Sequence, residues 1–133
     1  MGAWGTGIFE DDASLDLLAD AIESDAESFI RNSSSHFNEE YLEYDQCQEV
    51  IVSGVILDAL LNKTTYRSSD KEFQEWIANQ EIKELANLKE SILKGLKVVI
   101  SEKSELNELW QENEEEYYSW RKNIETLTAN LGG

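Results

Sequence analysis

The chain has 133 residues, which is the size of a single domain and is long enough to bury a core without a metal or a disulfide. Its 28 acidic and 11 basic residues give a formal net charge of −17. This charge excludes direct binding to nucleic acid or to an anionic membrane, because both require a cationic footprint, and it favours a cationic protein partner. The apolar share of 41% argues against disorder, and the lack of proline favours helices.

The first ten residues differ from the rest of the chain. They interleave three glycines with large apolar side chains such as Trp4. Glycine permits unusual backbone angles while large apolar side chains seek a core, so we expect an ordered, Gly/Trp-rich extended or turning segment. Asp11 and Asp12 then favour the start of a helix, whose apolar spacing continues to about Arg31 before a polar break at residues 32–35.

The middle of the chain predicts one long helix and one short helix. The long helix covers residues 38–62; its first half is acidic, and residues 50–61 are apolar on nearly all sides. A helix that is apolar all round is typical of a central position, surrounded by other helices. The same apolar run is too short and too polar to span a bilayer. After a loop at residues 63–69, a short helix carries Trp76.

Two more helices are expected in the last third of the chain. One covers residues 82–100, and the other begins after a capping Ser101 or Ser104 and ends at Gly132. No stretch shows the two-residue alternation that is typical of a strand. The sequence therefore predicts an all-α protein, with a single domain over residues 1–133 built as an irregular bundle of about five helices.

Residues for nucleophilic or zinc chemistry are scarce. The chain has one histidine, His36, in a polar segment, and one cysteine, Cys47, on a predicted helix where we expect it to be buried. A Ser–His or Cys–His arrangement would have to use His36, and a zinc site requires several such ligands. We therefore expect no catalytic residue, no cofactor, no bound metal and no enzyme. One thiol cannot form an internal disulfide, and no basic segment precedes an apolar stretch at the N-terminus, so we expect a cytoplasmic protein.

Paired glutamates leave one enzymatic hypothesis open. Helical nucleotide pyrophosphatases hold magnesium with Glu-x-x-Glu motifs, and this chain has such pairs at Glu40 and Glu43 and at Glu72 and Glu75. The alternative function is therefore a metal-dependent nucleotide phosphohydrolase. Other glutamate pairs in the chain share the spacing, and residues 32–62 hold no lysine or arginine for substrate phosphates, so this hypothesis ranks below a binding function.

Two acidic segments that carry tyrosines are candidates for partner binding. One lies at the start of the predicted long helix, and the other precedes Tyr117 and Tyr118. If Tyr117, Trp120 and Ile124 face the core, Tyr118 lies on the next face among carboxylates. Exposed aromatic anchors with a charged rim are typical of binding hot spots. The candidate contact residues are Tyr41, Glu43, Tyr44, Glu112, Glu115 and Tyr118.

The opening residues also carry a motif. Residues 1–16 resemble a bacterial family catalogued as a domain of unknown function, number four-two-five-nine, whose members begin Gly-x-Trp-Gly-x-Gly-x-Phe and continue through an acidic segment into a helix. Residues 104–110 are similar to the same family. Asp11, Ala13 and Ser14 depart from the usual Asn, Asp and Ala. The positions that match, for which we expect a structural role, are Trp4, Gly5, Gly7, Phe9, Asp12 and Trp110.

The resemblance implies a helical single domain from bacteria with no assigned reaction. Small acidic bacterial proteins of this kind are often immunity proteins that block a cationic toxin, commonly a nuclease. By that analogy, and because the charge agrees with it, we expect a non-enzymatic immunity or inhibitor protein that is a monomer or a homodimer. A third hypothesis is a structural or oligomeric module that joins its partner through residues 112–118.

Overall fold

The computed structural model describes residues 12–35, 41–62, 71–81, 83 and 85–132. The expected N-terminal segment, His36 and the loop at residues 63–69 lie outside them. Seven helices occur in the described part, which confirms the all-α class. They are α1 (Asp12–Ile22), α2 (Ala26–Ser34), α3 (Tyr44–Asn62), α4 (Lys71–Ala78), α5 (Leu85–Val99), α6 (Glu105–Gln111) and α7 (Glu114–Asn130).

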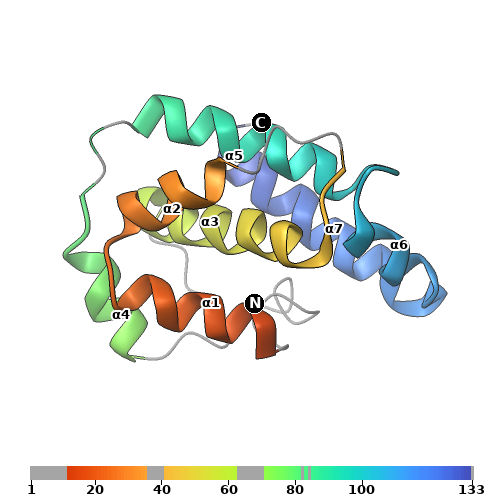
Figure 1. Ribbon diagram of the computed structural model, residues 1–133, viewed down its shortest axis with the longest axis horizontal. Helices are drawn as coiled ribbons and strands as arrows, with labels where there is room; N and C mark the ends of the chain where they lie inside the picture. The colour runs from red at the N-terminus through yellow and green to blue at the C-terminus, as the bar shows by residue number, and fades with distance from the viewer. Residues whose placement is uncertain (1–11, 36–40, 63–70, 82, 84, 133) are drawn as a thin grey trace.

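Helix α3 runs through the middle of the molecule, and the other helices lie around it (Figure 1). Every residue from Val50 to Ala59 is buried, so the helix presents no solvent face along this stretch. This confirms the central position that the all-round apolar pattern predicts. The packing includes one very close approach. A Cβ atom added at Gly54 would lie 3.0 Å from Leu127 Cδ2 of α7 and 3.5 Å from Ile92 Cγ2 of α5.

One charged residue is buried in this core. Asp58 of α3 is 0% exposed. The side-chain amide of Asn62 donates a hydrogen bond of 2.7 Å to its Oδ1, and that of Asn130 donates one of 3.3 Å to its Oδ2. Burying a carboxylate is costly unless donors satisfy it. These amides join the end of α3 to the end of α7.

The predicted helix from Asp11 to Arg31 is wrong as one continuous element. It is divided into α1 and α2 at residues 23–25. Asp25 has an extended backbone, and its side chain accepts hydrogen bonds from the Ser28 backbone N–H at 2.8 Å and the Ser28 hydroxyl at 3.1 Å. These two bonds hold the pKa of Asp25 below its ordinary value. The local cap thus starts a new helix where the apolar spacing alone predicts continuation.

The predicted last helix is also divided, into α6 and α7. Ser104 caps α6 as expected, because its hydroxyl accepts from the Asn107 backbone N–H at 3.1 Å. Asn113 caps α7 by accepting from the Glu116 N–H at 3.3 Å. The two helices fold against one another, with the rings of Trp110 and Trp120 stacked at 5.9 Å between centroids.

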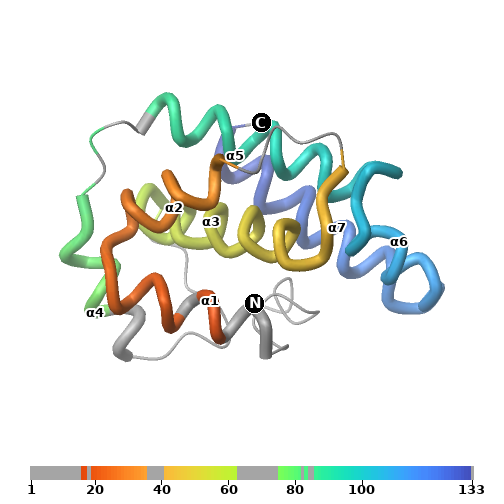
Figure 2. The backbone as a smooth tube through the Cα atoms, viewed as in Figure 1, coloured from red at the N-terminus to blue at the C-terminus, as the bar shows by residue number. Residues whose placement is uncertain are grey.

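The long helix starts later than predicted, at Tyr44 instead of residue 38. Residue 42 instead forms an isolated parallel bridge with residue 104. The Leu42 N–H donates to the Lys103 carbonyl and the Glu105 N–H donates to the Leu42 carbonyl, both at 2.9 Å. These long-range bonds satisfy backbone groups that a helix would otherwise pair. They place the start of α3 beside the start of α6 (Figure 2).

The close approach at Gly54 predicts intolerance of a larger side chain. Gly54→Val forces branched carbons into the contact with Leu127 and Ile92, and overpacking of this kind costs about 1–3 kcal/mol. We expect a lower free energy of unfolding in urea. Ala19→Val, at an exposed position of α1, is the matched control and costs at most about 0.7 kcal/mol. Equal stability losses in the two variants would contradict this packing.

Candidate functional site

The two tyrosine-bearing segments lie at the same end of the molecule, around α6 (Figure 1). The Tyr41 hydroxyl donates a hydrogen bond of 3.3 Å to Glu108 Oε2. The Tyr44 backbone N–H donates one of 2.7 Å to Glu105 Oε1. Both glutamates belong to α6, which leads directly into Glu112 and the first turn of α7. The segment with Tyr41 and Tyr44 and the segment that starts α7 are about seventy residues apart in the sequence. Both are therefore held next to α6.

This end of the molecule is strongly acidic. Residues 102–116 contain seven glutamates and one lysine. Three of the glutamates form the first turn of α7, where the helix dipole favours negative charge. Eight of the exposed side chains at this end make up what we call the acidic end surface. They are Tyr41, Glu43, Glu108, Leu109, Glu112, Glu114, Glu115 and Tyr118.

Large apolar side chains stand among these carboxylates. Tyr118 is 77% exposed, Leu109 is 46% exposed and Tyr41 is 42% exposed. Tyr118 lies on the face beside the apolar stripe of Tyr117, Trp120 and Ile124, whereas Leu109 and Glu108 are not among the contact residues predicted from the sequence. Both lie on the predicted long last helix, and they project at this end because that helix breaks after Gln111.

The ring beneath Tyr118 is firmly held. Tyr117 meets Tyr118 edge to face with 5.9 Å between ring centroids. The Tyr117 hydroxyl donates to Asn107 Oδ1 at 2.9 Å and accepts from Arg121 Nη1 at 3.1 Å. The bond from Arg121 to Tyr117 raises the pKa of the Arg121 guanidinium. Tyr118 is thus an exposed aromatic side chain on a rigid base.

Two hollows lie on α6 and the start of α7. The first has a volume of about 290 Å³, and Tyr44 forms part of its wall together with Leu106, Leu109, Trp110 and Asn113. The second, of about 500 Å³, is lined by Gln111, Glu114, Tyr117 and Tyr118. Tyr44 is half-buried, so it contributes a wall of the first hollow and does not stand free. Hollows beside exposed aromatic groups are places where a partner's side chains can be received.

At this end of the molecule the pKa values of one tyrosine hydroxyl and one thiol are raised. Partial shielding from water, together with the charges of Glu108 and Glu105, raises the pKa of Tyr41, so its hydroxyl stays a hydrogen-bond donor. Cys47 is fully buried, as predicted, with its Sγ 3.2 Å from Ser104 Oγ. Its burial raises the pKa of the thiol, and the hydrogen bond between Cys47 and Ser104 offsets this rise only in part.

Each glutamate pair of the metal hypothesis has one side chain outside the described part of the chain. Glu40 and the side chain of Glu72 fall there, so the two pairs have no described geometry. Among the side chains that are described, no group of three or more histidine, cysteine, aspartate or glutamate residues could hold a metal ion. Within the same residues, no helix combines the length and apolar character needed to cross a membrane.

The positions of the opening motif also fall mostly outside the described residues. This applies to Trp4, Gly5, Gly7 and Phe9, while Asp12 is the first residue of α1. Trp110 is described, and its ring stacks on that of Trp120.

Comparison with known proteins identifies the family. The chain belongs to the family described as Domain of unknown function (DUF4259), which matches residues 2–123. This confirms the resemblance of the opening motif and of residues 104–110. No curated protein and no solved structure matches the chain.

The buried thiol predicts a pH dependence of stability. Because burial raises the pKa of Cys47, the unfolded chain loses this proton first as the pH rises past about 8.5. The free energy of unfolding should therefore fall as the pH rises above about 8.5. Urea unfolding of the wild type and of Cys47→Ala measures this effect, and the variant, although less stable overall, should show the shallower fall. If the free energy of unfolding depends on pH in the same way in both proteins, the thiol of Cys47 is not the cause of the fall.

Proposed function

We propose that this protein is a non-enzymatic binding protein that captures a cationic protein through the acidic end surface. The single observation that carries the proposal is Tyr118, a 77% exposed aromatic side chain beside the glutamates that start α7. An aromatic anchor within a charged rim is the common form of a binding hot spot. Leu109 and Tyr41 extend the apolar part of the same surface.

The charge of the chain supports a cationic partner. A net charge of −17 attracts a basic protein over a distance and raises the rate of encounter. The carboxylates of the acidic end surface then supply acceptors for the lysine and arginine side chains of the partner. The two hollows beside α6 offer places for side chains that anchor the complex.

In its finer form, the proposal is that the protein is an immunity protein. It would act in the cytoplasm of a bacterium, as a monomer or homodimer, by covering the basic active-site cleft of a toxin. A nuclease is the favoured toxin class, because a cleft that binds phosphates is itself cationic and so complements this surface. An inhibitor needs rapid association, which opposite charges provide.

Charge reversal tests the surface. The variant replaces Glu43, Glu112 and Glu115 with lysine, and the assay is growth rescue on co-expression with the toxin domain encoded immediately upstream. We expect loss of rescue and a dissociation constant raised at least about tenfold, with wild-type binding weakened by salt. Failure of the well-expressed wild-type chain to rescue growth would contradict the immunity function.

A matched variant distinguishes the effect of the acidic end surface on binding from the effect of the total charge. Asp16, Glu23 and Glu81 are exposed and lie outside the acidic end surface. Their replacement with lysine changes the net charge by the same amount, and we expect rescue to persist. If both triple variants lose binding equally, the charge acts only as a whole and the surface assignment is wrong.

Truncation of the aromatic anchor is the second test of the surface. Tyr118→Ala removes an exposed ring, so the free energy of unfolding should stay nearly unchanged, while binding to the same toxin domain should weaken by about 2 kcal/mol or more. Calorimetric titration measures the affinity. Leu61→Ala is the control, because Leu61 is 39% exposed on α3 and lies outside the acidic end surface. If Tyr118→Ala binds the toxin domain with wild-type affinity, Tyr118 is not part of the binding site.

A further inference from the structure

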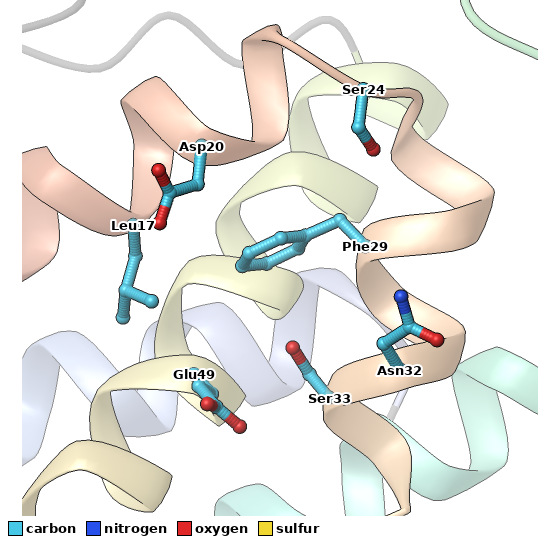
Figure 3. A pocket seen from close by; sticks show the side chains of 7 residues that line it. All are labelled: Leu17, Asp20, Ser24, Phe29, Asn32, Ser33 and Glu49. Carbon is cyan, nitrogen blue, oxygen red and sulfur yellow. The ribbon is translucent and has the colours of Figure 1, made fainter.

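The hollows of the protein differ in what they offer to a partner. The one between α1, α2 and α3 contains the ring of Phe29 and the carboxylate of Glu49 (Figure 3), and Glu49 already has an interaction partner. The hollow beside Leu109 has no charged residue among those described in its wall. The hollow of about 500 Å³ combines a carboxylate, an amide and two aromatic rings, and it is called the tyrosine hollow below. Its lining residues are Gln111, Glu114, Tyr117 and Tyr118.

Two helices hold the walls of the tyrosine hollow. Glu114 and Tyr118 are four residues apart on α7, so their side chains lie on the same face of that helix. Gln111 is the last residue of α6, on the other side of the turn that Asn113 caps. Tyr118 is 77% exposed, and its ring meets that of Tyr117 at an interplanar angle of 63°. A face of the Tyr118 ring is therefore accessible to a partner.

The charge around the tyrosine hollow is negative. Residues 104–120 contain six glutamates and no lysine or arginine. The first basic residue after them, Arg121, forms an ion pair with Glu125, with 3.3 Å between Nε and Oε2. Lys122 is not among the described residues that line the hollow. An anionic occupant is therefore disfavoured, and a cation supplied by another molecule is favoured.

The neighbouring face of α7 shows how this helix binds a guanidinium group. Arg121 donates from Nη1 to the Tyr117 hydroxyl at 3.1 Å and from Nε to Glu125 Oε2 at 3.3 Å. A tyrosine and a carboxylate on one helix face thus hold a planar cation between them. Glu114 and Tyr118 present the same two kinds of side chain on the next face, beside an open hollow.

The composition of the walls favours arginine over other cations. A guanidinium group is planar, so it can stack on an aromatic ring while its N–H groups donate to a carboxylate. The ammonium of lysine is a compact and strongly hydrated charge, which gains less from an open aromatic wall. A bare metal ion would leave the rings uncovered and would meet a single carboxylate in this wall.

We propose that the tyrosine hollow receives an arginine side chain of the partner protein. The guanidinium would stack on the ring of Tyr118 and donate hydrogen bonds to the Glu114 carboxylate and to the side-chain oxygen of Gln111. Its five N–H donors exceed what these acceptors require, so the rest stay in contact with water. The inference rests on the proposed function for the partner being a cationic protein, and it identifies the side chain that anchors that partner.

Titration of the full-length protein with three short peptides, followed by NMR at physiological ionic strength, tests the site. The peptides are acetylated and amidated Gly-Arg-Gly, Gly-Lys-Gly and Gly-citrulline-Gly, in which citrulline keeps the planar shape of arginine without its charge. We expect saturable shifts of the Tyr118 ring with the arginine peptide, and an affinity at least about threefold above that of the lysine peptide. The citrulline peptide should not saturate. Equal affinities of the arginine peptide and either other peptide would overturn the proposal.

Variants identify the groups that hold the arginine. Glu114→Gln should weaken binding of the arginine peptide by about three- to fivefold, as expected for an exposed ion pair. Glu116→Gln is the matched control, because Glu116 is an exposed glutamate of the same helical turn that does not line the hollow. It should bind within about twofold of the wild type, since salt screens the more distant charge. Equal effects of the two substitutions would show that only the general charge acts, and would contradict the site.

The aromatic ring is tested by two substitutions at one position. Tyr118→Leu removes the ring and should weaken the arginine peptide by about threefold, whereas Tyr118→Phe keeps the ring and should bind as the wild type does. Because Tyr118 is exposed, we expect both variants to fold. Equal losses in the two variants would contradict stacking on the ring.

The peptides also distinguish this inference from the proposed function. If the protein rescues growth and binds the toxin domain but does not bind the arginine peptide, the arginine site is wrong and the binding function stands. If the arginine peptide binds at Tyr118 but the well-expressed protein gives no rescue, the arginine site stands and the immunity function is wrong.

Discussion

The fold depends on the burial of one helix. Because α3 has no polar face from Val50 to Ala59, water must be excluded from all of its sides, and the remaining helices are arranged to do so. Gly54 allows α7 to approach this helix closely. The charge at Asp58 is tolerated in the same core because two amides satisfy it. Apart from Asp58, the charged side chains that the structure describes lie on or near the surface of the surrounding helices.

Each of the hollows described above is lined by residues of more than one helix. The helices around α3 differ in length and direction, and hollows lie on α6 and the start of α7 and between α1, α2 and α3. At one end the pair α6 and α7 carries the acidic end surface; stacking of Trp110 on Trp120 joins the two helices, and Trp120 is buried in the core. On another face α1 and α2 separate over Glu49. The rigid support reduces the entropy lost when a partner is bound.

The sequence predicts the features that depend on local periodicity. The all-α class, the central helix, the buried Cys47 and the cap at Ser104 are among these. The breaks at Asp25 and Asn113 are harder to predict, because both residues are compatible with an exposed helical face and cap a helix only when the chain turns there. The start of α3 cannot be derived from local pattern at all, since residue 42 pairs with a segment more than sixty residues away. The exposure of Leu109 and the hollow beside Phe29 depend on those breaks.

The pairing between residues 42 and 104 has a consequence for the order of folding. Neither segment can complete its backbone hydrogen bonds until the chain has been synthesised past residue 105, so α6 and α7 are joined to the earlier helices late. The acidic end surface is composed of side chains from both sides of this junction. A nascent or truncated chain therefore lacks the complete surface, so the binding proposed for it would require a chain that has finished folding.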